Sequence, residues 1–198
     1  AGVQFLPYPY AYRCPFEAGG DHTARMSSAM LRTMLADVEC GVLPAAAVME
    51  LVQGEGGVIA APDGWVRDVR AILEAHHVPM VVDEVQTGWG RTGKLYCFEH
   101  AGIEPDVLVL SKAIGGGQPL AVIVYDRALD VWKPGAHCGT FRGNQLAMVA
   151  GLATLKVLTE QQLPQHAARM GARLRGHLES IAAEWACIGD VRGRGLML

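Results

Sequence analysis

Two side chains in this sequence have the types and positions needed for chemistry on a carbonyl compound. Asp83 lies in the predicted strand 79–85, and Lys112 directly follows the predicted strand 106–111. A lysine at the tip of a buried strand is partly desolvated, which lowers its pKa and lets the neutral amine form a Schiff base. Pyridoxal phosphate (PLP) needs such a lysine together with a carboxylate on its pyridine nitrogen. Asp83 and Lys112 therefore predict a PLP site.

The alternative interpretation is a structural ion pair, because an arbitrary Asp and Lys at strand ends more commonly cap those strands. The neighbouring residues favour the interpretation as a PLP site. Ligands of open α/β sheets bind outside the carboxyl ends of the strands. Further polar residues lie at the ends of the apolar runs: Glu50, Gln53, Glu55, Glu84, Gln86 and Ser111. Three glycines at 115–117 follow and predict a tight connection beside the cofactor.

The elements that must hold these residues alternate between strands and helices. Apolar runs at 45–52, 79–85, 106–111 and 121–125 predict strands. Helical spacing predicts one helix around Met26 to Leu35 and a second from Asp63, the expected N-cap, to His76. The segment 144–158 is apolar nearly all round, which predicts a helix buried on several sides. The fold class is therefore α/β, with a buried and mainly parallel sheet flanked by helices.

Pro164 opens a helix of another kind, in which charged faces flank a single apolar stripe. The stripe consists of Met170, Leu174, Leu178, Ile181 and Trp185. We therefore expect a domain boundary near residue 160. The first residues, AGVQFLPYPY, carry no signal-peptide pattern, and the last, VRGRGLML, stop inside an apolar segment. Both ends predict a fragment of a longer chain.

Composition narrows the class of protein. The 198 residues carry a formal net charge of −3 and are 51% hydrophobic and 19% charged, as in soluble globular proteins. Charged residues interrupt every apolar run that could span a bilayer. Lysines and arginines are scattered, so no basic stripe predicts nucleic-acid binding. The five cysteines are an odd number without a CxxC pair, which favours a reducing cytoplasm over a disulfide framework.

Three motifs occur together and in order: DEVQTGWGRTG at 83–93, LSKAIGGG at 110–117 and GTFRGN at 139–144. With them the sequence resembles the class III PLP-dependent aminotransferases over essentially the whole chain. The segments FLPYPYAYRCPF, ELVQGEGG and GTFRGNQLAM resemble most the diaminobutyrate–2-oxoglutarate aminotransferases of that family. The resemblance implies the large domain of a fold-type I PLP-dependent transferase, with residues 1–160 as its central part and 161–198 as the start of the small C-terminal domain.

The resemblance also implies roles for individual residues. Lys112 would bind PLP and shuttle the proton, Asp83 would pair with the pyridine nitrogen, and Gln86 would hydrogen-bond near the ring hydroxyl. Thr140 would bind the cofactor phosphate of the neighbouring subunit, which implies a homodimer with shared active sites. Glu55 matches a gating glutamate that pairs with an arginine for an amine substrate and releases it for 2-oxoglutarate. That arginine and the family's phosphate loop lie outside residues 1–198, so we expect the isolated segment to be inactive.

Other interpretations remain open. The implied reaction transfers the terminal amine of 2,4-diaminobutyrate, but ornithine, acetylornithine, 4-aminobutyrate or another omega-amine could replace it. A non-catalytic remnant serving as an interaction module is a further alternative. Residues 88–93 match the GxGxxG pattern of dinucleotide-binding turns, yet no clear helix follows them. Cys97 with His100, and His137 with Cys138, have metal-like spacing without a second pair, so we expect no metal site.

Overall fold

The computed structural model describes residues 2–17, 20–37, 43–140 and 142–198, and every structural statement below concerns these residues. Its centre is a four-stranded sheet in the order β1-β4-β5-β6. The strands are β1 (Ala47–Met49), β4 (Met80–Asp83), β5 (Val107–Leu110) and β6 (Val122–Tyr125). β1, β4 and β5 are parallel, whereas β6 runs antiparallel to β5. The predicted α/β class with a mainly parallel sheet is confirmed.

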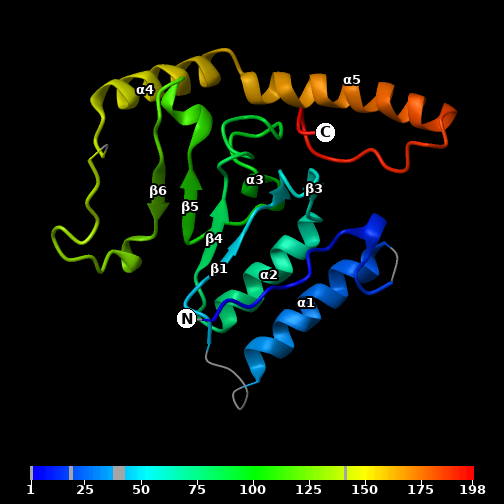
Figure 1. Cartoon of the computed structure of the whole chain (residues 1–198), viewed down its shortest axis with the longest axis horizontal. Helices are drawn as coiled ribbons and strands as arrows, with labels where there is room; N and C mark the ends of the chain where they lie inside the picture. Colours follow the sequence, from blue (N-terminus) through cyan, green and yellow to red (C-terminus); the bar gives the residue numbers. More distant parts are fainter. Residues whose placement is uncertain (1, 18–19, 38–42, 141) are drawn as a thin grey trace.

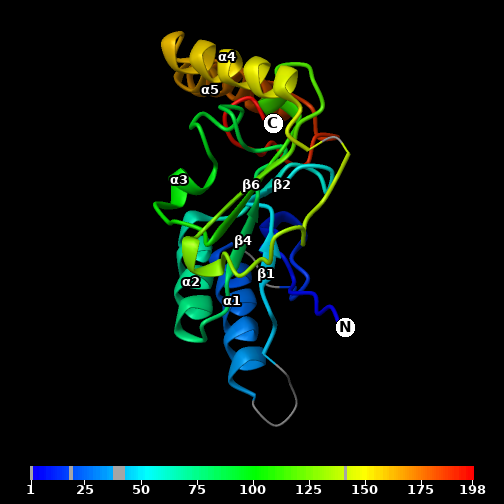
Figure 2. The same cartoon turned by 90° about the vertical axis from the view of Figure 1, so that its left-hand side faces the viewer.

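Two helices, α1 (Asp21–Ala36) and α2 (Asp63–Ala75), lie side by side next to the sheet (Figures 1 and 2). The inner face of α2 is buried as predicted and joins one hydrophobic core with Met80, Val82 and Leu108 of the sheet. The Trp65 indole N–H donates to Ser27 Oγ at 3.1 Å and so links α2 to α1. The expected N-cap is displaced by one residue, because Pro62 caps α2 and Asp63 is its first helical residue.

Short elements connect these layers. β2 (Val52–Gln53) and β3 (Ile59–Ala60) form a small antiparallel hairpin, and the turn between them carries Glu55. The short helix α3 is Phe98–Ala101, and three 3-10 helices are η1 (Ala11–Arg13), η2 (Lys112–Gly115) and η3 (Arg127–Leu129). The GxGxxG segment leads into turns and the four-residue α3 rather than into a long helix. A dinucleotide-binding turn is therefore not formed here.

The helices α4 (Gln145–Glu160) and α5 (Leu163–Glu184) run across the end of the sheet at which β4 and β5 terminate (Figure 1). The prediction that 144–158 is buried on several sides is wrong for the described chain. Leu146 is 76% exposed and Leu152 is 69% exposed. α4 packs mainly against η2 and the start of α5, so one side of an almost wholly apolar helix is covered.

The predicted inner stripe of α5 is also wrong. Leu174, Ile181 and Trp185 are exposed, and the buried face consists of Pro164, Ala167 and Gly171. The reason is close backbone packing: a Cβ on Gly171 would overlap the carbonyl oxygen of Gly195. Small side chains therefore let α5 approach the C-terminal segment 192–198, which lies beneath it (Figure 1).

The turn at residues 161–162 between α4 and α5 falls where we expected a domain boundary. The division itself stays a prediction. No helix among the described residues combines the length and apolar character needed to cross a membrane.

Candidate active site

The parallel pairing of β4 and β5 places Asp83 and Lys112 at the same edge of the sheet. Asp83 lies opposite Val109 in the register, and the Glu84 N–H donates to the Val109 carbonyl at 2.9 Å. Lys112 follows three residues after Val109, as the first residue of η2. The two side chains therefore start from adjacent strands at the carboxyl ends, where open α/β sheets bind ligands.

Lys112 has an unusual backbone. Its φ is +53°, in the left-handed region that costs an L-residue about 1–2 kcal/mol. Close packing holds the segment, because a Cβ on Gly116 would lie 2.6 Å from Thr154 Oγ1 of α4, and one on Gly151 would overlap the Ile114 carbonyl oxygen. A strained residue that packing holds in place is typical of functional sites. The side chain is exposed, however, so the partial desolvation that we expected for Lys112 is not provided by the described residues.

The alternative of a structural ion pair is not supported by the geometry. Among the ion pairs of the described residues, none joins Asp83 to Lys112. The half-buried Asp83 accepts a hydrogen bond on Oδ1 from the Val85 N–H at 2.9 Å. That bond fixes the carboxylate against its own turn. Carboxylate and ammonium are thus held at one sheet edge without neutralising each other.

A second contact joins two predicted site residues that are 31 positions apart. Gln86 Nε2 donates to Glu55 Oε1 at 2.7 Å. The approach depends on Gly54, since a Cβ there would overlap Gln86 Oε1. The sheet edge after β4 and the hairpin turn after β2 therefore meet, and the sequence alone did not predict this contact.

Thr140 is not brought to the other residues. It is exposed, in a turn that follows the long connection after η3, and within the described chain no hydrogen bond or ion pair joins it to Asp83, Gln86, Lys112 or Glu55. Its predicted role in a neighbouring subunit's site stays a prediction.

Glu84 is a residue whose role the sequence analysis missed. It is 1% exposed, and its carboxylate accepts hydrogen bonds from the Thr87 hydroxyl and from the Phe98 N–H, the latter at 2.9 Å. Burial raises the pKa of this carboxyl group, while the bonds from Thr87 and from the backbone near Phe98 oppose the rise. Glu84 thereby connects the turn after β4, which carries Gln86, to the start of α3. A carboxylate at the end of the apolar run 79–85 was the available signal.

Two arginines of the C-terminal segment were missed as well. Arg192 Nε donates to the Gly57 carbonyl at 2.9 Å, and its guanidinium lies 5.1 Å from the centre of the Tyr10 ring. Arg194 pairs with Asp63 at 2.7 Å and donates to the Ala61 carbonyl. These contacts span more than 130 positions of the chain, so no local pattern could reveal them. They fasten the β2–β3 turn and the segment that follows β3.

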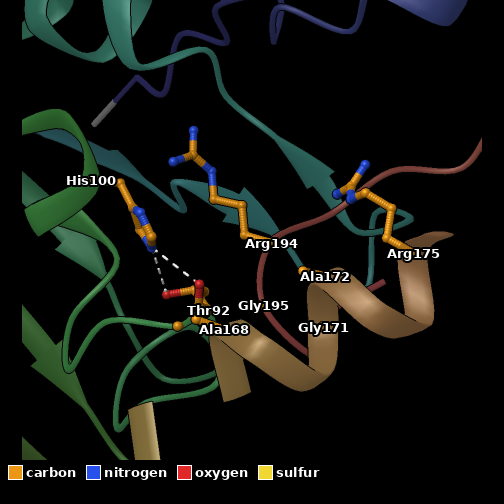
Figure 3. A pocket seen from close by; sticks show the side chains of 9 residues that line it. Thr92, His100, Ala168, Gly171, Ala172, Arg175, Arg194 and Gly195 are labelled. Atoms are coloured by element: carbon orange, nitrogen blue, oxygen red, sulfur yellow. Dashed lines mark hydrogen bonds between the residues drawn. The ribbon is translucent and has the colours of Figure 1, made fainter. Parts of the chain in front are cut away.

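A cavity of about 310 Å³ lies between α5, the turn at 92–93 and the C-terminal segment (Figure 3). His100 contacts Thr92 there, with its Nε2 3.1 Å from the Thr92 carbonyl oxygen, and burial lowers the pKa of its imidazole. The guanidinium of Arg175 is engaged with backbone carbonyls. None of the predicted site residues lines this cavity. No group of three or more His, Cys, Asp or Glu within the described ranges could hold a metal ion.

The arrangement of Asp83, Lys112, Gln86 and Glu55 can be compared with known proteins. The model of the family described as "Aminotransferase class-III" matches residues 1–198. The chain belongs to the class III aminotransferases. Among its aminotransferase relatives, the diaminobutyrate–2-oxoglutarate aminotransferase of Rhizobium meliloti (strain 1021) is 58% identical over 198 residues, which are 100% of this chain and 42% of the relative. The enzyme of the same name from Haemophilus influenzae is 50% identical over 198 residues and is covered to 44%.

Solved aminotransferase structures have the same fold. An amine transaminase from an uncultivated Pseudomonas species, solved in a PLP-bound form, superposes with a TM-score of 0.86 at 29% sequence identity. The match covers 96% of this chain and 45% of that one. The chain thus spans less than half the length of the relatives and structures it matches. The family and the fold predicted from the motifs are confirmed.

Proposed function

We propose that the complete protein carrying this chain is a PLP-dependent aminotransferase that moves the terminal amino group between 2,4-diaminobutyrate and 2-oxoglutarate or glutamate. One observation carries the proposal. Asp83 and Lys112 leave adjacent parallel strands at the same edge and do not pair with each other. The choice of substrates is supported by the relatives named diaminobutyrate–2-oxoglutarate aminotransferases, which are 58% and 50% identical to this chain.

The donor set at this edge fits PLP. An amine, a carboxylate and an amide come from Lys112, Asp83 and Gln86, and Gly117 leaves open space after Lys112, since nothing lies within 4 Å of a Cβ built on it. When bound, PLP supplies an electron sink for the carbanion that forms when the substrate loses a proton. Lys112 would bind it covalently, Asp83 would hold the pyridine nitrogen protonated, and Gln86 would bind near the ring hydroxyl.

The residues of this chain then act as acid, base and orienting groups. The amine of Lys112, freed when the substrate amine takes its place, would take the proton from the substrate carbon that bears this amine and would deliver it to the carbon that Lys112 had occupied. The negative charge of Asp83 keeps the ring proton in place, because a carboxylate stabilises a nearby positive charge. The Val85 N–H holds the Asp83 carboxylate, whereas the exposed Lys112 side chain is not paired with it, so Lys112 can move its proton while Asp83 stays in position.

Glu55 would let one site accept two kinds of substrate. A dicarboxylate needs a positive charge in the site, whereas an omega-amine needs that charge concealed. A glutamate that pairs with an arginine in one half-reaction and leaves it in the other meets both needs. Glu55 is exposed on the β2–β3 turn and makes no ion pair among the described residues, so its carboxylate is available for that exchange.

The proposal extends to the oligomeric state, the domains and the location of the complete protein. The complete protein is a homodimer, with Thr140 reaching the phosphate of the neighbouring subunit's cofactor. Residues 1–160 are the central part of the large domain, and 161–198 begin the small domain. The location is cytoplasmic, for which three cysteines give support: Cys97, Cys138 and Cys187 are free thiols among the described residues.

The test is a single-turnover reaction of the purified complete protein with a panel of amines, followed by cofactor absorbance. We expect 2,4-diaminobutyrate to convert the cofactor to its amine form and 2-oxoglutarate to restore it. Faster conversion by ornithine, acetylornithine or 4-aminobutyrate would keep the aminotransferase and replace the substrate. A protein that neither binds PLP nor reacts with any amine would contradict the proposal and favour the interaction module.

A further inference from the structure

The contact between Gln86 and Glu55 has no place in the roles given above, where Gln86 serves the cofactor and Glu55 serves the substrate. We propose that Gln86 is also a positioning residue for Glu55. Its amide holds the Glu55 carboxylate in the position that this carboxylate occupies when a dicarboxylate substrate is bound. The inference rests on the proposed function and concerns how the same site selects between its two substrates.

The backbone of the Glu55 turn is held on both sides. The Gly54 N–H donates to Glu50 Oε2 at 2.8 Å, and the Gly57 N–H returns to the Gly54 carbonyl at 3.2 Å. At the other end of the turn, the Gly57 carbonyl accepts a hydrogen bond from Arg192 Nε at 2.9 Å. Because these hydrogen bonds hold the turn, the backbone of Glu55 stays in one position. The choice of partner must therefore be made by rotation of the Glu55 side chain itself.

Gln86 is the partner that the structure gives to this side chain. Its Nε2 donates to Glu55 Oε1 at 2.7 Å. The pair is exposed, so a hydrogen bond between a neutral amide and a carboxylate stabilises it only modestly. An arginine can therefore draw Glu55 away when an omega-amine binds. Once a dicarboxylate takes the arginine, the amide of Gln86 receives the released carboxylate and keeps it from the substrate's negative charge.

Gly54 provides the space for this contact. A Cβ on Gly54 would overlap Gln86 Oε1, the far end of a flexible side chain, and the φ of Gly54 lies outside the left-handed region. Gly54→Ala should therefore displace the Gln86 amide without straining the turn. Gly56→Ala is the matched control, since its Cβ would meet Gln53 at 3.3 Å and would not approach Gln86.

The experiment measures binding of glutarate, a dicarboxylate that cannot react, to the complete protein loaded with PLP. We expect Gly54→Ala to weaken glutarate binding by roughly three- to tenfold, as for loss of one exposed hydrogen bond, and Gly56→Ala to leave it within about twofold of the unmodified protein. In Gly56→Ala the rate of the half-reaction with 2,4-diaminobutyrate should change by less than about twofold, and in Gly54→Ala it should change less than glutarate binding does. In a Glu55→Ala background, Gly54→Ala should have no further effect on glutarate binding.

Two results would overturn the assignment. The first is equal glutarate binding by Gly54→Ala and the unmodified protein. The second is a loss that persists in the Glu55→Ala background, because it would then act through the cofactor or the turn and not through Glu55. Failure of the unmodified protein to react with 2-oxoglutarate would overturn the proposed function, and with it this inference.

Discussion

The two halves of the candidate site are built in different ways. Around Asp83 the chain is closely packed: Glu84, Thr87 and Thr92 are at most 2% exposed, and Glu84 accepts two hydrogen bonds. Around Lys112 the chain is open, since Lys112, every residue of β6 and much of α4 are exposed. The carboxylate half is thus positioned by residues of this chain. The lysine half has its backbone fixed but its side chain uncovered.

The two halves should respond differently to substitution. A change at the open half should alter chemistry and leave folding intact, because few contacts depend on it. A change within the packed half should alter stability, unless it exchanges groups of the same shape. Substitutions in the complete protein test that distinction.

The largest effect is expected from Lys112→Ala. Removing the proposed acid and base should slow transamination by roughly 10²- to 10⁴-fold. The midpoint of thermal unfolding without cofactor should stay about the same, because Ala keeps the Cβ that is strained at a φ of +53° and the exposed side chain is not packed. Steady-state kinetics and calorimetry would measure both. Lys156→Ala, at an exposed lysine of α4 whose pair with Glu160 spans 3.8 Å, is the control. Activity of Lys112→Ala equal to that of the control would contradict the assignment.

Asp83→Asn is expected to have the next largest effect. The amide can still accept the Val85 N–H, so the turn after β4 should fold. A neutral group cannot hold the pyridine nitrogen protonated, and the rate should fall roughly 10²-fold, as for loss of one fixed electrostatic contact. Turnover assays beside Asp68→Asn, at an exposed carboxylate of α2, would check this. Near-normal turnover would restore the purely structural interpretation of Asp83.

Glu84→Gln tests the packed half through the pH dependence of stability. Burial raises the pKa of Glu84 above its usual value of 4.5, so the folded state retains a proton that the unfolded state loses. The stabilisation from that proton is complete below the unfolded pKa and is lost as pH rises through the folded pKa. Gln has the same shape and no proton to lose, so the variant should gain stability relative to the unmodified protein by at most about 1.4 kcal/mol per pH unit in that window.

Denaturant unfolding of the two proteins from about pH 4 to about pH 8, a range that begins below the unfolded pKa of a glutamate, would measure this drift. Glu74→Gln, at an exposed position of α2, should show none of it. A constant difference in stability between the Glu84→Gln variant and the unmodified protein across the whole range would contradict the effect of burial.

The smallest effect is expected from Thr140→Val, which removes one hydroxyl from the open half. PLP affinity should fall roughly three- to tenfold, as for one exposed hydrogen bond. Because Thr140 is proposed to serve the neighbouring subunit, mixed dimers of Thr140→Val and Lys112→Ala chains contain one intact site. At a PLP concentration too low to load the Thr140→Val protein, mixing the two variants should therefore recover up to half of the unmodified activity per hybrid dimer. No recovery on mixing would contradict the shared site.

The sequence predicted the fold more completely than the site. Continuous apolar runs indicated β4 and β5, and with them the positions of Asp83 and Lys112, because parallel strands bring their carboxyl ends to one edge. The burial of α4 and α5 was mispredicted, because hydrophobic periodicity states which face could be buried and not what is available to cover it. On α5 the face with small side chains around Gly171 is buried, because it packs closely against the backbone of Gly195.

The contacts that the sequence could not predict are those between distant segments. Gln86 meets Glu55 only because Gly54 leaves room, and Arg192 reaches Gly57 across 135 positions. Neither follows from local spacing. The roles of Lys112, Asp83, Gln86, Thr140 and Glu55 stay predictions until they are tested.

The central claim is that Lys112 is the residue that binds the cofactor. Borohydride reduction of the complete PLP-loaded protein, followed by peptide mass mapping, tests it directly, because reduction fixes the cofactor on the amine that holds it. Within residues 1–198 there are four lysines: Lys94, Lys112, Lys133 and Lys156. We expect the pyridoxyl group on the peptide containing Lys112. Labelling of Lys94, Lys133 or Lys156 in its place would contradict it.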